Sequence, residues 1–182
     1  METLAEPRPL VTSSHYSRDR HDTLMRLDSR SIDAPILELI TAFNTLPCCF
    51  TLQSCYGHFI STPDQDDRSC EPVPRHHGGP VRYRIAYVAV CLENTEAGRA
   101  LHDSLGQLAA SDPEYVQFGS ADWFWQRHVN SYALQVEPIR YMRMDEAVLD
   151  HAEALRVQER RNLLFTDLAD LVHRMLKSHG AG

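Results

Sequence analysis

The sequence predicts a single α+β domain in which helices flank a mixed β-sheet. Strand-like and helical stretches alternate without a regular βαβ repeat. Residues 145–177 carry apolar residues every three or four positions, which predicts one long C-terminal helix or two shorter ones. The lack of a βαβ repeat favours this class over a doubly wound sheet, and the absence of a G-x-G-x-x-G motif after a predicted strand is consistent with a fold that is not Rossmann-type.

The composition is that of an ordinary globular protein. The chain has 182 residues, of which 43% are hydrophobic and 24% are charged, and both values lie near globular averages. A chain of this length buries roughly two-thirds of the surface that its unfolded form exposes. Residues 1–14 show little periodicity, so we expect a flexible or loosely docked N-terminal segment there and one domain over residues 15–182.

The clearest predicted helix lies between Asp33 and Leu46. Asp33 stands where a helix cap belongs, and Pro35 is tolerated in the first turn. Apolar residues follow at helical spacing, namely Ile36, Leu39, Ile40, Phe43 and Leu46.

Two strands and a long loop are expected next. Residues 48–60 are of types that suit a pleated surface, so they predict a strand that is interrupted at Gly57. Residues 61–80 combine prolines, a glycine pair and an acidic run, which predicts a long exposed loop. Residues 81–92 alternate in the manner of a buried or half-buried strand.

A covering helix and two more strands complete the prediction. Asn94 stands at the position of an N-cap, and a helical stripe follows it, made of Ala97, Leu101, Leu105 and Leu108. Residues 115–118 and 131–136 predict strands, with an irregular or bulged segment expected at residues 122–130.

Charge and cysteine usage limit the classes of function. The net charge is −7 with the ten histidines neutral, so bulk charge gives no help in binding the phosphates of RNA. No apolar run is long enough for a membrane span, and the first residues do not have the pattern of an export signal. The five cysteines have no framework spacing, so we expect free thiols and a cytoplasmic protein.

The segment Ser54-Cys55-Tyr56-Gly57-His58 is the main candidate site. It follows a predicted strand, and its small, polar and glycine residues let a backbone approach a ligand closely. The alternative is a β-bulge that contains a buried thiol. Catalysis by Cys55 has little support, because a residue three positions along a strand, such as His58, points to the opposite face.

The setting of this segment supplies a resemblance. An Ile32-Asp33 pair precedes a helix that leads to Asn44, and a strand containing Thr51 then enters Ser54-Cys55-Tyr56-Gly57. This order resembles the tRNA wybutosine-synthesis methyltransferases (4-demethylwyosine N4-methyltransferase-like), in which a Val/Ile-Asp pair, an Asn and a Thr-rich strand precede a Ser-Ser-Cys-Ser/Ala-Gly-Arg motif. The likeness extends, more loosely, over most of the chain.

The resemblance implies a function and a set of site residues. Members of the family use S-adenosylmethionine to methylate a ring nitrogen of the tricyclic base beside the anticodon, so tRNA or a modified nucleoside becomes the expected partner. The resemblance also implies that the catalytic site contains Asp33, Ser54, Cys55 and His58. Ser54, Cys55 and Gly57 are expected next to the cofactor.

Three departures from the family motif favour an alternative function. Gln53 replaces the first serine, Tyr56 replaces a small residue, and His58 replaces the arginine. A neutral histidine cannot pair bidentately with a carboxylate or phosphate as arginine does. A ligand-binding or regulatory relative that does not methylate is therefore the alternative. We expect His58 to govern ligand binding rather than stability.

Aromatic and basic side chains elsewhere add candidates. Trp123 can stack on a base or on the adenine of the cofactor, although tryptophan is also a common core anchor. We expect Trp125 to pack inside and Trp123 to be partly exposed. Arg82 and Arg84 give one strand a basic face, for which solvated charges are the simpler explanation.

A zinc-containing structural module is the remaining alternative. Five potential zinc ligands occur near the motif and in the loop after it, namely Cys55, His58, Cys70, His76 and His77. Their spacing is irregular and prolines interrupt it, so we expect no structural metal in this loop.

Overall fold

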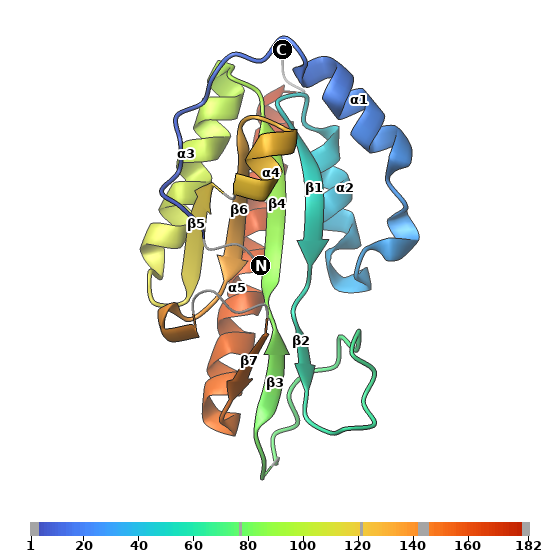
Figure 1. The fold of residues 1–182 in the computed structure, drawn as a ribbon, viewed down its shortest axis with the longest axis vertical. Coiled ribbons are helices and arrows are strands. Elements are labelled where there is room, and N and C mark those ends of the chain that lie inside the picture. Colours follow the sequence, from blue (N-terminus) through green and yellow to red (C-terminus); the bar gives the residue numbers. More distant parts are fainter. Residues whose placement is uncertain (1–3, 77, 121, 142–145, 180–182) are drawn as a thin grey trace.

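The computed structural model describes residues 4–76, 78–120, 122–141 and 146–179. Two antiparallel sheets lie end to end along the long axis of the molecule (Figure 1). The larger sheet has the order β1-β4-β6-β5, with strands Cys49–Cys55, Ala86–Leu92, Ser131–Val136 and Val116–Ser120. The smaller sheet has the order β2-β3-β7, with strands His58–Ile60, Val81–Arg84 and Glu146–Leu149.

Both sheets are built on the same pair of chain segments. β1 pairs with β4 as far as Cys55 opposite Tyr87, and β2 pairs with β3 from His58 opposite Arg84. The register is therefore the same on both sides of the break. In Figure 1, β2 continues the line of β1 and β3 leads into β4.

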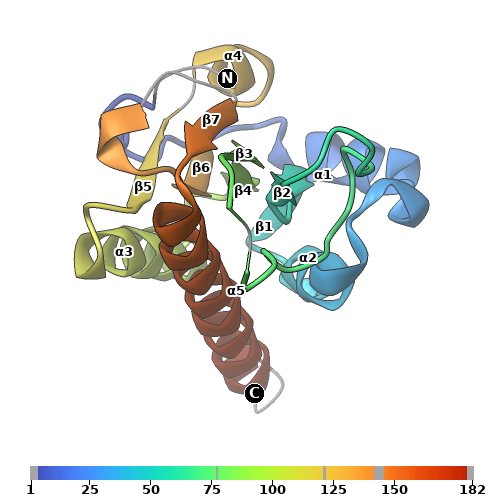
Figure 2. The same cartoon turned by 90° about the horizontal axis from the view of Figure 1, so that it is seen from below.

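The helices cover the sheets unequally. Figure 2 shows α2, α3 and α5 on one side of the sheets and α4 on the other. The helical elements are α1 (Tyr16–Arg26), η1 (Ser29–Ser31), η2 (Ala34–Ile36), α2 (Leu37–Thr45), α3 (Glu96–Ser111), α4 (Asp122–Arg127), η3 (Ile139–Tyr141) and α5 (His151–His179). α5 contacts α2, β3 and β6, so the long C-terminal helix spans both sheets.

The predicted apolar stripes form the core. All five stripe residues of the predicted helix 33–46 are buried, namely Ile36, Leu39, Ile40, Phe43 and Leu46. They pack with buried residues of β4 and α5 in one continuous cluster. The α+β class, the flanking helices and the long C-terminal helix are confirmed, while two antiparallel sheets replace the expected mixed sheet.

Several local predictions are wrong. Residues 122–127 form α4 instead of an irregular segment, and residues 146–149 form β7 instead of part of a helix. In β7 the buried Ala147 and Leu149 alternate with the exposed Val148, because pairing with β3 outweighs the local helical spacing. The expected helix start, Asp145, lies outside the described residues.

A further correction concerns a helix end, and the N-terminal segment has a contact with the sheet. Thr95, not Asn94, caps α3, since its Oγ1 accepts a hydrogen bond from Gly98 N at 3.2 Å. The described part of the N-terminal segment is docked, because Ala5 pairs with Ser120 at the edge of β5. No helix in the described ranges has the length and apolar character needed to cross a bilayer.

Candidate functional site

The site begins with a break in the strand at Gly57. This residue has a φ of +87°, and a Cβ added to it would lie 2.7 Å from the Cβ of Ala86. A side chain is therefore excluded on two grounds, backbone conformation and space. The break ends the alternation of β1, so Cys55 and His58 face the same cavity, and the prediction that they point to opposite faces is wrong.

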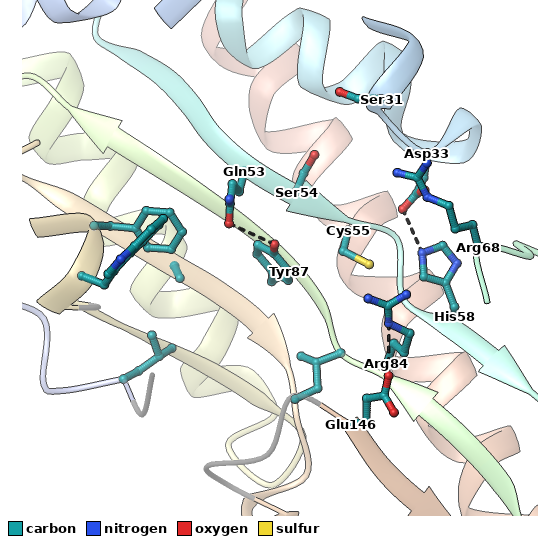
Figure 3. A pocket seen from close by; sticks show the side chains of 15 residues that line it. Ser31, Asp33, Gln53, Ser54, Cys55, His58, Arg68, Arg84, Tyr87 and Glu146 are labelled. Atoms are coloured by element: carbon teal, nitrogen blue, oxygen red, sulfur yellow. Dashed lines mark hydrogen bonds and ion pairs between the residues drawn. The ribbon is translucent and has the colours of Figure 1, made fainter. Parts of the chain in front are cut away.

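A cavity of about 850 Å³ lies beside this break (Figure 3). Its size falls within the range of small-molecule sites, roughly 300–1,000 Å³. Ser54, Cys55 and His58, three of the predicted site residues, all border this one cavity. The side chains around the cavity include Asp33, Gln53, Ser54, Cys55, His58, Arg68, Arg84, Tyr87, Trp123, Phe124 and Glu146.

Asp33 does not cap its helix. It occupies the N-cap position of η2 but makes no side-chain capping hydrogen bond. Its Oδ2 accepts a hydrogen bond from Tyr56 N at 2.7 Å and lies 3.4 Å from His58 Nε2. The predicted capping role is therefore wrong. Burial acts to raise the pKa of Asp33, but the hydrogen bonds from His58 and Tyr56 outweigh it and leave the pKa below its usual value.

His58 is an interior residue, with a side chain only 4% exposed. Its Nδ1 lies 3.1 Å from the carbonyl oxygen of Ser69, and because a carbonyl only accepts, Nδ1 carries a proton. Hydrogen bonds with Asp33 and Cys55 raise the pKa of His58 to about 10, against the opposing effect of burial. Because the ring is buried and bonded on both sides, we now expect His58 to contribute to stability as well as to the site.

Cys55 completes a group of three polar side chains. The Gly57 N–H donates to its Sγ at 3.4 Å. One potential ligand atom from each of Asp33, Cys55 and His58 lies within 4.8 Å of the other two. The five cysteines are free thiols, as predicted. Of the loop histidines, His76 is exposed and His77 lies outside the described residues.

Arg161 of α5 contacts the backbone at the break, and it was not among the residues predicted from the sequence. Its Nη1 donates to Gly57 O at 2.9 Å, and its guanidinium lies 3.9 Å from the ring centroid of Tyr56. The residue is 2% exposed, and burial lowers its pKa. The sequence does contain a pattern that could have identified Arg161. It occupies a core position in a helical stripe that is otherwise apolar, made of Ala154, Val157, Leu164 and Leu168.

A second contact ties the helix before the site to the strand that carries it. The Asn44 side chain accepts from Thr51 N at 2.8 Å and donates to Thr51 Oγ1 at 2.9 Å. This pair joins the end of α2 to β1, four residues before Cys55. These hydrogen bonds fix the position of β1 relative to α2, and β1 carries Cys55 to the cavity.

Aromatic side chains form another wall. Trp123 is 40% exposed and lines the cavity, with the Arg127 guanidinium 3.7 Å from its ring centroid. Trp125 is half-buried against Tyr132, at a centroid distance of 5.7 Å. Trp123 is partly exposed, as predicted, whereas Trp125 packs against the core without being fully buried. Tyr87 also lines the cavity, and burial raises its pKa to about 12.

The basic face of β3 is partly neutralised. Arg84 Nε lies 3.4 Å from Glu146, and Arg82 pairs with both Glu146 and Asp67. Arg84 and Glu146 line the cavity, as does Arg68 from the loop. Arg68, Tyr87 and Glu146 were not among the predicted site residues, because their approach to Cys55 depends on chain segments distant in sequence.

The comparisons with known proteins concern the fold. No protein-family model and no curated protein matches the sequence. Among solved structures, PH1069 protein from Pyrococcus horikoshii is similar with a TM-score of 0.53 and 14% identity, over 87% of this chain and 96% of that chain. Another structure, of PH1069 protein from Pyrococcus horikoshii OT3, has a TM-score of 0.45 and 14% identity, over 93% and 95%. The first likeness supports the α+β arrangement, and neither name states an activity.

Proposed function

We propose that this protein is an S-adenosylmethionine-dependent N-methyltransferase that acts on a modified nucleoside of the wybutosine type in tRNA. One observation carries the proposal. Asp33 and the adjacent pair Ser54-Cys55, which match the family motif and come from two separate segments, converge with His58 on a cavity of about 850 Å³. A cavity of this size suits a cofactor together with part of a nucleoside.

The contacts among the motif-matching residues give additional support. Asp33 binds the backbone of Tyr56, and Asn44 binds Thr51. Each pair joins two separate parts of the family pattern. The residues that produce the resemblance are therefore in contact with one another in this chain: Asp33 with the Cys55-Tyr56-Gly57 segment, and Asn44 with the strand before it.

The cavity offers contacts for the proposed ligands. S-adenosylmethionine would supply a methyl group on a positively charged sulfur. The ring faces of Tyr87, Trp123 and Phe124 provide stacking surfaces for adenine or for a tricyclic base. Arg68 and Arg84 provide donors for a carboxylate. The protein has to align the methyl group with the attacking nitrogen and to exclude water, and both tasks are met by positioning alone.

A ligand-binding relative without methylation is the second candidate. The motif arginine is replaced by His58, whose ring is already held between Asp33 and Ser69. It therefore offers no free bidentate donor to a ligand. The net charge of −7 also opposes binding to RNA.

Calorimetric titration with S-adenosylmethionine tests the shared part of both candidates. We expect saturable binding of one equivalent, weakened by about tenfold in Arg84→Ala, as for loss of a charged hydrogen bond. Arg82→Ala is the matched control, because Arg82 lies on the same strand and pairs with the same Glu146 but does not line the cavity. Absence of binding to the wild-type protein would contradict the proposal.

Transfer of a labelled methyl group separates the two candidates. The protein is incubated with labelled S-adenosylmethionine and with tRNA that carries the demethylated tricyclic base, and unmodified tRNA serves as the control. Label in the modified tRNA alone supports the methyltransferase. Binding of the cofactor without transfer supports the non-catalytic relative.

A further inference from the structure

Asp33, Cys55 and His58 present three different ligand types to one point of the cavity wall. A carboxylate oxygen, a sulfur and an imidazole nitrogen lie within 4.8 Å of one another. Two of these atoms, Asp33 Oδ2 and His58 Nε2, are 3.4 Å apart. Ligands of tetrahedral Zn²⁺ are separated by about 3.3–3.6 Å, given bonds of roughly 2.0 Å to nitrogen or oxygen and 2.3 Å to sulfur. The 3.4 Å separation already lies in this range, and the 4.8 Å limit exceeds it by about 1.2 Å.

Each of the three side chains is oriented by a backbone group outside the cluster. Ser69 O accepts from His58 Nδ1 at 3.1 Å, which leaves Nε2 directed at Asp33. Tyr56 N donates to Asp33 Oδ2 at 2.7 Å, and Gly57 N donates to Cys55 Sγ at 3.4 Å. Metal-binding histidines typically donate their other ring N–H to a carbonyl or carboxylate, and metal-binding carboxylates are themselves hydrogen-bonded. The cluster has this arrangement for all three ligands.

We propose that Asp33, Cys55 and His58 form a binding site for a thiophilic divalent cation of the Zn²⁺ class, with the remaining coordination position open to the cavity. The thiolate selects against Mg²⁺ and Ca²⁺, which prefer oxygen ligands alone. Three protein ligands and one open position are the pattern of zinc sites that bind water or a substrate. The proposal does not depend on the proposed methyltransferase activity.

Binding of a divalent cation leaves the net charge of the cluster unchanged. Binding displaces the proton of the Cys55 thiol and the proton that His58 Nε2 shares with Asp33, and both leave to solvent. One thiolate and one carboxylate then neutralise the two charges of the metal. The buried guanidinium of Arg161 is hydrogen-bonded to the nearby Gly57 carbonyl. A metal cluster without net charge does not repel this guanidinium.

This site is distinct from the zinc site considered for the loop of residues 61–80. None of its three members belongs to that loop, and the Ser69 carbonyl of the loop is an outer contact to His58. Cys70 lies near the cluster as a half-buried free thiol but is not one of its three members. Cys55 and Cys70 therefore provide a matched pair for testing which sulfur binds the metal.

Titration of chelator-treated, dialysed protein with Co²⁺ tests the proposal, because a cobalt–thiolate bond produces a charge-transfer absorption band. We expect the band to saturate at one equivalent and to disappear when Zn²⁺, but not Mg²⁺, is added. Cys55→Ser should abolish the band and Cys70→Ser should retain it. Asp33→Asn should weaken Zn²⁺ binding by about tenfold or more. Circular dichroism of each variant establishes that it is folded.

Three results would overturn the proposal. These are absence of the band in the wild-type protein, its persistence in Cys55→Ser, and its loss in a folded Cys70→Ser variant. If Cys55→Ser does not fold, Zn²⁺ competition against a chromophoric chelator in Asp33→Asn decides, and unchanged affinity there contradicts the site. No measurement in this series uses S-adenosylmethionine, so failure of metal binding is distinguishable from failure of the proposed function.

Discussion

Arg161 on α5 donates a hydrogen bond at 2.9 Å to the carbonyl oxygen of Gly57, at the break between β1 and β2. The same guanidinium stacks on the ring of Tyr56. A residue of the C-terminal helix therefore holds the short segment that directs Cys55 and His58 into the cavity. The stability of the fold and the shape of the site are linked through this contact.

Replacing Arg161 by Ala should destabilise the protein by about 2–3 kcal/mol, because a buried carbonyl loses a charged donor and Tyr56 loses its stacking partner. Urea unfolding measures the change. Arg160→Ala is the control, since Arg160 is 42% exposed and pairs with Asp112 at the surface, where an ion pair contributes about 1 kcal/mol or less. Equal losses for the two variants would show that Arg161 has no special role.

Replacing Gly57 by Ala should lower stability by about 1–3 kcal/mol, since the left-handed backbone and the 2.7 Å approach to Ala86 both oppose a side chain. Gly106→Ala in α3 is the opposite case, because its nearest neighbour would be Phe118 at 3.8 Å. That change should be neutral or stabilising by about 0.5–1 kcal/mol. Thermal unfolding of the two variants gives the comparison, and a neutral Gly57→Ala would contradict the strained turn.

Replacing His58 by Ala should cost about 2–4 kcal/mol in chelator-treated protein, because the change removes one partner of a buried ion pair. His76→Ala, at an exposed loop position, should stay within about 0.5 kcal/mol. A double-mutant cycle with Asp33→Ala measures the coupling between the two side chains, which we expect to be about 1–3 kcal/mol. Additive losses in the cycle would mean that the pair is not coupled.

Replacing Asn44 by Ala should destabilise the protein by about 1–2 kcal/mol, since both hydrogen bonds to Thr51 are lost and a backbone N–H of β1 is left without its acceptor. Thr45→Ala, at the next position and exposed, removes only a local bond to Thr41 O and should cost about 0.5 kcal/mol or less. Chemical denaturation distinguishes them. If Asn44→Ala is as mild as its neighbour, the link between α2 and β1 is not important for stability.

Local periodicity was sufficient for much of the fold. The helix that contains Ile40 and Phe43, the strands on either side of the loop and the interruption at Gly57 were all predicted, because each depends on residues close together in the sequence. The prediction failed for residues 146–149, where the local helical spacing lost to pairing with β3.

By itself, the sequence determined the α+β class, the core stripes and the segment around Cys55 that lines the cavity. Only the tertiary structure decided what the polar side chains there do. The Asp33 side chain contacts Tyr56 and His58 instead of capping the helix that follows it. Arg161 occupies a core position and donates a hydrogen bond to Gly57 O. The physical reason is that a buried polar group must find a partner, and that partner comes from whichever segment the packing of the core brings within reach, not from its neighbours along the chain.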